Sequence, residues 1–275
     1  MNIVFVHRNQ ELASFRYRCA IPGAELSKSH EVFFNGGDAS VCIFSKPHAD
    51  DIDIAAAARG NGCHIVVDIG DDHFSHPAIG PVYNRMLEIA DSVVCPTQNM
   101  QTRLREFTEK DITVIPDPYE MPLEEPHADG EEFIWFGHQS NLGDLRRYAS
   151  DIPALKIVTG PQKIKGTILY SPESLSKAMG EANISLLPTR KGVEYKSPNR
   201  LLNSLRMGLF PVCDEHPAYE EFKDFAWTSG LFHGVAWAKH FRSDLNGLVK
   251  EGQEYIEKYS PENVGEIWLD FIDSI

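Results

Sequence analysis

Short β-rich runs alternate with helical patterns along most of this chain. The runs at 2–8 (NIVFVHR), 64–70 (HIVVDIG) and 112–116 (ITVIP) are rich in Val and Ile, and segments with helical patterns lie between them. Strands that alternate with helices of about ten residues are typical of βαβ units, whose strands form a mainly parallel sheet. The sequence therefore predicts an α/β fold.

The alternation stops once and then resumes. Residues 117–132 contain three prolines and six acidic residues before Glu132, without apolar periodicity, which is typical of a linker. We therefore expect two α/β domains, with ligands at the carboxyl ends of the strands and in the cleft between the domains. The expected parts are an N-terminal domain at 1–118, a linker at 119–132, a C-terminal domain at 133–258 and a terminal helix at 259–275.

Composition excludes several classes of protein. The chain has 275 residues and a net charge of −14, which argues against sequence-independent binding to nucleic acid, because such binding depends on neutralising phosphates. Its five cysteines are dispersed without a CxxC pair, as expected for reduced thiols in a cytoplasmic protein. No apolar run approaches the ~18 residues of a membrane span, and the start of the sequence lacks the pattern of a signal peptide.

One segment of this acidic chain is basic. Residues 156–206 contain nine basic and three acidic side chains. An anion-binding site explains this excess, and a solvated basic face is the alternative. Within the segment, Ser197 is a suitable helix N-cap, Pro198 a suitable first helical residue and Gly208 a suitable stop. The free N–H groups of such a helix start, flanked by Lys196 and Arg200, predict a phosphate or diphosphate site.

A second group of polar residues follows the strand at 64–70, in the turn DIGDDHFSH (68–76). Asp71, Asp72 and His73 could orient or deprotonate a hydroxyl group, cap a surface turn, or bind a divalent ion. The residues after the first strand, His7 and Arg8, would lie at the same edge of the sheet. Arg16 and Arg18, on the expected first helix, could reach a bound acceptor or be solvated. Neither GxGxxG nor GxxxxGK[ST] occurs, which argues against a standard dinucleotide or P-loop site.

The stretch YKSPNRLLNSLRMGLFPV (195–212) resembles the carboxyl-domain signature of GT-B fold glycosyltransferases of family 4, also called group 1. The resemblance implies two Rossmann-like domains that face a cleft, with the C-terminal helix packing back on the N-terminal domain. Further segments resemble the same family in the same order, namely 15–32 (FRYRCAIPGAELSKSHEV), 66–74 (VVDIGDDHF), 90–107 (ADSVVCPTQNMQTRLREF), 112–120 (ITVIPDPYE) and 133–141 (FIWFGHQSN).

The resemblance also implies a donor site for a nucleotide-diphosphate sugar. In the family, a pair of glutamates spaced Glu-x7-Glu precedes the glycine, and the second binds ribose. Here Asn203 stands at the second position, and Glu194 is one residue out of register for the first. The expected donor-binding residues are Gly137, His138, Tyr170, Arg190, Glu194, Ser197, Asn199 and Asn203. The expected catalytic residues are Lys196 and Arg200 for the leaving group and Asp71, Asp72 and His73 for the acceptor, with His7, Arg8 and Arg16 on the acceptor side.

The resulting hypothesis is a glycosyltransferase that moves a hexosyl or pentosyl group from a nucleotide-diphosphate sugar to a hydroxyl acceptor. The resemblance implies retention of anomeric configuration, and we expect no obligatory metal or cofactor. One alternative keeps this chemistry but places the acceptor on a modified base in DNA. Another is a protein that binds the nucleotide sugar without catalysis, or a GT-B epimerase that acts on the donor alone.

Overall fold

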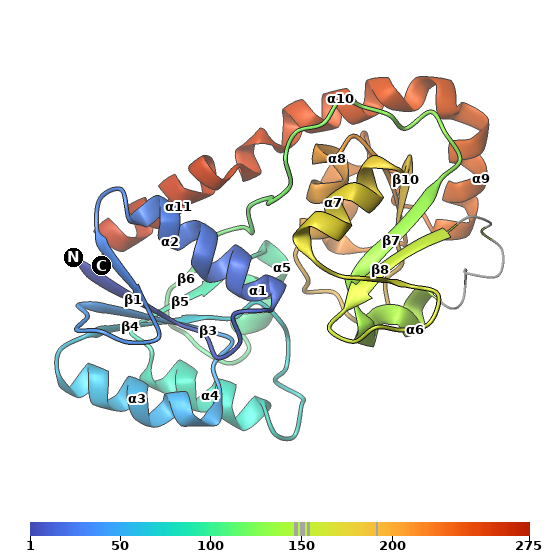
Figure 1. The fold of residues 1–275 in the computed structure, drawn as a ribbon. Helices are drawn as coiled ribbons and strands as arrows, with labels where there is room; N and C mark the ends of the chain where they lie inside the picture. Colours follow the sequence, from blue (N-terminus) through green and yellow to red (C-terminus); the bar gives the residue numbers. More distant parts are fainter. Residues whose placement is uncertain (146–147, 149–151, 153–154, 191) are drawn as a thin grey trace. The chain divides into compact units, whose positions relative to one another are not determined.

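The computed structural model describes residues 1–145, 148, 152, 155–190 and 192–275. The chain forms two units (Figure 1). The first unit contains Met1–Pro118, Tyr195–Ser197 and Lys258–Ile275, and the second contains Tyr119–Glu194 and Pro198–Glu257. The segment 119–132, expected as a linker, therefore belongs to the second unit, and three residues of the basic segment belong to the first.

A six-stranded parallel sheet forms the centre of the first unit, in the order β2-β1-β3-β4-β5-β6. Because all the strands run in one direction, their carboxyl ends lie along one edge of the sheet. This arrangement confirms the predicted α/β fold with a parallel sheet. The strands are β1 (Asn2–Val6), β2 (Glu31–Phe34), β3 (Val41–Ser45), β4 (His64–Asp68), β5 (Ser92–Cys95) and β6 (Ile112–Val114).

Helices cover both faces of this sheet. Alternate residues of β1 point to opposite faces, so Val4 packs in one apolar core and Phe5 in the other. The core around Val4 includes residues of α3 (Ala49–Gly60), α4 (Gly80–Ile89) and α5 (Gln98–Leu104). The core around Phe5 includes residues of the π-helix Arg16–Ala20, α2 (Ile21–Leu26) and α11 (Pro261–Asp273). The short helix α1 (Ala13–Phe15) precedes the π-helix.

The C-terminal helix α11 is part of the first unit. It begins after Ser260, whose side chain caps the helix, with Pro261 in its first turn. Trp268 is fully buried and lies with its ring 6.0 Å from the ring of Phe5. A Cβ atom on Gly265 would lie 2.5 Å from the side chain of Glu25, so α11 packs closely against α2. The return of the terminal helix to the N-terminal domain, which the resemblance implies, is confirmed.

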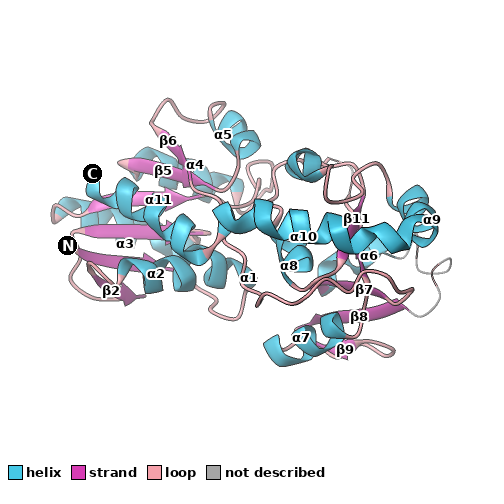
Figure 2. Ribbon diagram, turned by 90° about the horizontal axis from the view of Figure 1, so that it is seen from above, coloured by secondary structure: helices cyan, strands magenta, loops and turns pink. Residues whose placement is uncertain are grey.

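The second unit also has a parallel sheet, of five strands in the order β11-β10-β7-β8-β9. Figure 2 labels β7, β8, β9 and β11 of this sheet. No helix within the described part of the chain is long and apolar enough to cross a membrane. The strands are β7 (Phe133–His138), β8 (Leu155–Gly160), β9 (Ile168–Leu169), β10 (Ile184–Leu187) and β11 (Phe210–Cys213). The helices are α6 (Leu142–Leu145), α7 (Pro172–Gly180), α8 (Asn199–Arg206), α9 (Leu231–Phe241) and α10 (Leu245–Tyr255). Of the helix expected near 141–149, α6 is the described part, and 146–147 and 149 lie outside the described residues.

Helix α8 confirms most of what the basic segment predicts. Leu201, Leu202 and Leu205 are fully buried. Gly208 has a φ of +76° and donates its N–H to the carbonyl of Leu205, while the N–H of residue 209 reaches the carbonyl of Ser204. These two bonds form a Schellman motif, which ends the helix as expected. The predicted start is wrong by one residue, because Pro198 holds the N-cap position and makes no side-chain cap.

The segment 119–132 is fastened to the second unit by hydrogen bonds. The side-chain oxygen of Asn203 accepts the N–H groups of Glu120 at 3.0 Å and Met121 at 3.4 Å. Further along, the N–H of Glu124 donates to the carbonyl of Arg206 at 2.8 Å. The side chain of Gln253, in α10, donates to the carbonyl of Glu124 at 2.8 Å. The segment thus lies against α8 and α10 of the second unit.

Candidate functional site

The carboxyl edge of the first sheet brings together polar side chains from three neighbouring strands. His7 follows β1, Lys46 follows β3, and the turn with Asp71 and His73 follows β4. We call these four residues the edge cluster. The ammonium of Lys46 lies 2.7 Å from Oδ2 of Asp71, and both side chains are partly buried. Of the four, Lys46 is the residue that sequence reasoning missed; the available signal was a lysine directly after a buried strand.

His7 has a defined hydrogen-bonding state. Its ring is buried, its Nδ1 accepts the N–H of Asn9 at 3.2 Å, and its Nε2 lies 3.1 Å from the hydroxyl of Ser14. Because Nδ1 is an acceptor, the proton of the neutral ring resides on Nε2. Burial lowers the pKa of His7, and the nearby charge of Lys46 adds to this effect. His7 is therefore neutral at pH 7.

Asp71 is held as a carboxylate. Burial alone would raise the pKa of Asp71, but the positive charges of Lys46 and Lys196 outweigh it and hold that pKa below its ordinary value. Lys196 belongs to the three-residue segment of the first unit, together with Ser197. An ionised Asp71 can accept a hydrogen bond from a hydroxyl group, and its lowered basicity makes it a poor proton acceptor.

His73 and Asp72 differ in what they can do. Burial and the charge of Lys46 lower the pKa of His73, against the opposing charge of Asp71, so its imidazole is free to accept a proton at neutral pH. Asp72 is bound elsewhere: one oxygen accepts from Nε of Arg103 at 3.1 Å and the other from the N–H of Phe74 at 3.2 Å. Within the described ranges, no group of three His, Cys, Asp or Glu residues is placed to hold a metal ion.

Two of the expected acceptor-side residues have protein partners. Nε of Arg8 donates to Oδ1 of Asp51 at 2.8 Å. The other oxygen of Asp51 accepts the N–H of His48 at 2.7 Å, at the start of α3. Arg8 thus fastens the end of β1 to α3. Arg16 is partly buried, with its guanidinium 5.9 Å from the centre of the Tyr17 ring.

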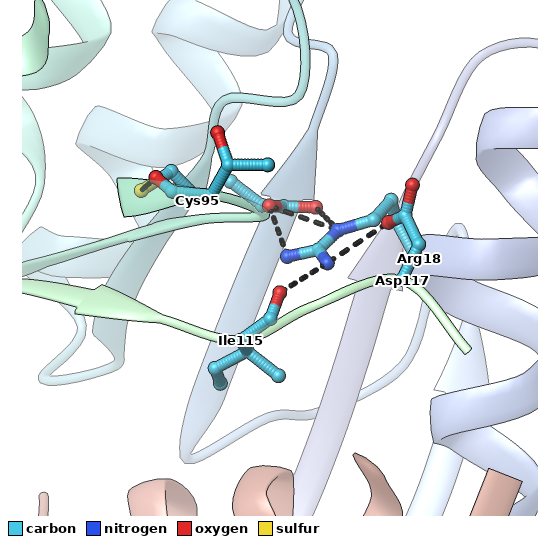
Figure 3. Close-up of polar contacts among 6 residues, drawn as sticks. Arg18, Cys95, Ile115 and Asp117 are labelled. Atoms are coloured by element: carbon cyan, nitrogen blue, oxygen red, sulfur yellow. Dashed lines mark hydrogen bonds and ion pairs between the residues drawn. The ribbon is translucent and has the colours of Figure 1, made fainter. Parts of the chain in front are cut away.

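The expectation for Arg18, either solvated or reaching an acceptor, is wrong. Arg18 is 2% exposed and lies at the centre of a buried network (Figure 3). Its guanidinium donates to Asp68 at 2.7 Å, to the carbonyl of Ile115 at 2.6 Å and to Asp117 at 3.1 Å. Burial raises the pKa of Asp117, although the positive charge of Arg18 opposes it. Arg18 points inward because the π-helix that carries it packs against the sheet.

In the second unit, the side chain of Arg200 lies close to the carboxyl end of β7. A Cβ atom on Gly137 would lie 3.7 Å from Nη1 of Arg200 and 3.2 Å from the ring of Trp135. Burial raises the pKa of Tyr219, and the nearby positive charge of Arg200 opposes this rise. Nη1 of Arg200 is buried and has no hydrogen-bond partner among the described residues. A buried N–H without an acceptor is costly, so an anion at this position would stabilise the site.

The loops around Arg200 hold other expected donor residues. His138 is exposed, and its Nδ1 accepts the N–H of Ser140 at 3.3 Å. Arg190 is also exposed and pairs with Asp144 at 3.2 Å. The carbonyl of Val193 accepts a hydrogen bond of 2.7 Å from Nε2 of His216, which fixes the loop before α8. His216 and Tyr219 are contacts of this site that the sequence did not suggest.

The remaining expected donor residues have varied surroundings. Glu194 is exposed, Tyr170 is half-buried after β9, and Asn199 is the first residue of α8. Asn203 is 1% exposed, and the backbone of Glu120 and Met121 occupies its side-chain oxygen. Asn203 therefore supports the segment 119–132 through its side-chain oxygen.

The expected site residues are divided between the two units. Those in the first unit are His7, Arg8, Arg16, Asp71, Asp72, His73, Lys196 and Ser197. Those in the second unit are Gly137, His138, Tyr170, Arg190, Glu194, Asn199, Arg200 and Asn203. The helix-capping role expected for Ser197 is wrong, since Pro198 holds the N-cap position of α8.

Two parallel α/β units, with the C-terminal helix returning to the first, are the architecture of the GT-B fold, and the expected fold is confirmed. The structure of Anabaena Alr3699/HepE in complex with UDP and glucose matches 100% of both chains at 11% identity, with a TM-score of 0.68. UDP-GlcNAc 2-epimerase from Neisseria meningitidis bound to UDP-GlcNAc also matches 100% of both chains, at 9% identity and a TM-score of 0.58. The trehalose-6-phosphate synthase OtsA matches 94% of this chain and 76% of its own, at 12% identity and a TM-score of 0.56. No protein family model and no curated protein sequence matches the chain.

Proposed function

We propose that this protein is a glycosyltransferase that moves a sugar from a nucleotide-diphosphate sugar to a hydroxyl acceptor, with retention of configuration. The second unit binds the donor, and the first unit supplies the residues for the acceptor. Two similar structures contain UDP or a UDP-sugar, which supports a donor of this class. The five cysteines are buried and unpaired as thiols, which supports a cytoplasmic enzyme.

The observation that carries the proposal is the buried Nη1 of Arg200, which lacks an acceptor among the described residues. Arg200 lies in the first turn of α8, where N–H groups without helical partners and the helix dipole favour an anion. Gly137, in β7, lies beside the guanidinium, since a Cβ atom there would be 3.7 Å from Nη1. A diphosphate group satisfies both the guanidinium and the helix start.

During transfer, negative charge develops on the departing diphosphate. A fixed cation and oriented N–H groups stabilise such charge without reorganising. Arg200 and the first turn of α8 supply these groups, so the reaction proceeds without an obligatory metal. Lys196, which precedes α8 in the sequence, supplies a further positive charge to the same reaction.

The edge cluster serves the acceptor. His73, whose pKa is lowered, takes the proton of the acceptor hydroxyl, and the carboxylate of Asp71 orients that hydroxyl. His7 is also neutral and forms part of the acceptor side. Asp72 and Arg8 support these residues through their bonds to Arg103 and Asp51.

Calorimetry with UDP, UDP-glucose, UDP-GlcNAc and GDP-mannose tests the donor site. We expect Arg200→Met to weaken binding of the preferred nucleotide at least about tenfold, the effect of losing a charge-assisted hydrogen bond. Lys223→Met is the matched control, because it removes one positive charge from an exposed position of the same unit. Equal affinity for Arg200→Met and the wild type would contradict the proposal, as would the failure of every nucleotide to bind.

A second candidate function is epimerisation of the donor. It is favoured by the match of the Neisseria epimerase, bound to UDP-GlcNAc, over the whole of both chains. Incubation with each nucleotide sugar distinguishes the two functions, because a transferase also releases free nucleoside diphosphate slowly to water. Proton NMR that shows an inverted sugar carbon with the nucleotide still attached would favour the epimerase. Activity that survives EDTA is expected of the metal-independent transferase.

A further inference from the structure

Lys46 has an unusual backbone conformation. Its φ is +50°, and it directly precedes Pro47. Residues other than glycine rarely adopt a positive φ, and asparagine does so more readily than lysine. Asn35 is the other such residue in the described part of the chain. Strained residues of this kind persist only where their surroundings fix them, and they are concentrated at functional sites.

This backbone conformation places the side chain of Lys46 against the turn that follows β4, the neighbouring strand of the sheet. Its Nζ lies 2.7 Å from Oδ2 of Asp71, and its side chain is 29% exposed. Its backbone N–H also donates to the carbonyl of Asp68, at 3.4 Å. Lys46 thus connects the end of β3 to the end of β4 through both its backbone and its side chain.

The salt bridge between Lys46 and Asp71 fixes the turn that carries His73. Asp71, two residues before His73, is bound by Lys46, and the adjacent Asp72 is bound by Arg103. The ring of His73 lies 6.0 Å from that of Tyr83, in α4. His73 therefore follows two carboxylates, each of which is held by its own cation.

The charges around the two histidines of the edge cluster have opposing effects. Lys46 and His76 favour the neutral form of His73, whereas Asp71 and Asp72 favour its protonated form. Lys46 and His48 favour the neutral form of His7, and Asp68 opposes them. Lys46 is the charge that acts on both rings and on Asp71.

We propose that Lys46 is a positioning residue for the transfer reaction, which holds Asp71 in place and supplies the positive charge that keeps His73 available as a proton acceptor. The inference rests on the proposed function. In the reaction, the acceptor oxygen bonds to the sugar carbon on the face from which the diphosphate departs, and its proton passes to His73. The bond from that carbon to the diphosphate oxygen breaks, and the electron pair leaves with the diphosphate.

NMR titration of the histidine side chains in the full-length free protein tests the inference, with the His73 signal assigned by a His73→Gln variant. In Lys46→Met we expect the titration midpoints of His73 and His7 to move to higher pH. The loss of the ammonium removes a repulsion and also frees the charge of Asp71 to act on His73. In Lys46→Arg, which keeps the charge, we expect midpoints close to those of the wild type.

Lys28→Met is the matched control, because Lys28 lies on the same unit but is 64% exposed and paired with Glu25. We expect it to leave both midpoints unchanged. A His73 midpoint that does not move in Lys46→Met would overturn the inference. So would an equal movement in Lys28→Met, which would show a general effect of net charge.

Lys46→Gly provides a second test in case Lys46→Met does not fold. Glycine adopts a positive φ without strain, so this variant removes the charge while keeping the backbone conformation. We expect its melting temperature to be at least that of Lys46→Met, and its His73 midpoint to be raised. The titrations contain neither donor nor acceptor. A protein without transferase activity would therefore refute the proposed function, while the titration would still show whether Lys46 acts on His73.

Discussion

The hydroxyl of Tyr119 donates a hydrogen bond of 3.1 Å to Glu257, and these two residues are the first and the last of the second unit. The guanidinium of Arg206 lies 4.2 Å from the centre of the Tyr119 ring and donates to Glu257 at 2.7 Å. Both ends of the second unit are therefore tied to the last turn of α8. Helix α8, whose first turn is proposed to bind the donor, therefore contacts both ends of the second unit through Arg206 in its last turn.

Replacing Arg206 by alanine tests this arrangement. We expect the free energy of unfolding to fall by about 1–2 kcal/mol, because a cation–π contact and a partly buried ion pair are lost together. Lys223→Ala removes an exposed i,i+3 pair from the same unit and should change stability by less than about 0.5 kcal/mol. Equal effects of the two substitutions in urea denaturation would show that the contacts of Arg206 contribute nothing beyond a surface pair.

Arg18→Met should be strongly destabilising. The substitution leaves Asp68 and Asp117 buried without their cation, which typically costs about 3–5 kcal/mol. Arg85→Met is the control, because Arg85 is 57% exposed and paired with an exposed Glu88. Chemical denaturation of both variants checks the prediction, and a loss under about 1 kcal/mol for Arg18→Met would contradict it.

The stability of the protein should decrease as the pH falls below about 6.5. Burial lowers the pKa of His7 from its ordinary value of 6.5, so the unfolded chain binds a proton at a higher pH than the folded chain does. Stability is therefore fully present above that value and is lost as the pH falls towards the pKa of the folded state. His7→Gln should flatten this dependence in denaturation measured between pH 7 and pH 5. A slope that is unchanged in the variant would exclude His7 as its source.

Gly208→Ala should destabilise the second unit by about 2 kcal/mol or more. The φ of Gly208 is +76°, and a Cβ there would lie 2.3 Å from the carbonyl oxygen of Glu125. Gly247→Ala is the matched control, since Gly247 is an exposed residue of α10 with open space around it. The control should increase the thermal melting temperature, because alanine favours a helix more than glycine does. A Gly208→Ala variant as stable as the wild type would show that the C-terminal stop of α8 tolerates a side chain.

The sequence by itself determined the regular elements and their order. The alternation of strands and helices predicts both parallel sheets, because each element carries its own periodicity within a few consecutive residues. The leucine stripe of α8 and its stop at Gly208 are likewise local patterns, and the structure confirms them. The basic segment indicated Arg200 as an anion-binding residue, although the buried state of its Nη1 is evident only in the structure.

Only the tertiary structure decided the partners of the polar side chains. Arg18 bonds to Asp117, 99 positions away in the sequence, and Asn203 to Glu120, 83 positions away. The resemblance placed Asn203 at a ribose site, but it could not show that the backbone N–H groups of Glu120 and Met121 bond to the side-chain oxygen of Asn203. Lys46 became a candidate because its strand lies between β1 and β4 in the sheet. Periodicity is a property of neighbours in the chain, whereas the charge and hydrogen bonds of a site depend on neighbours in space.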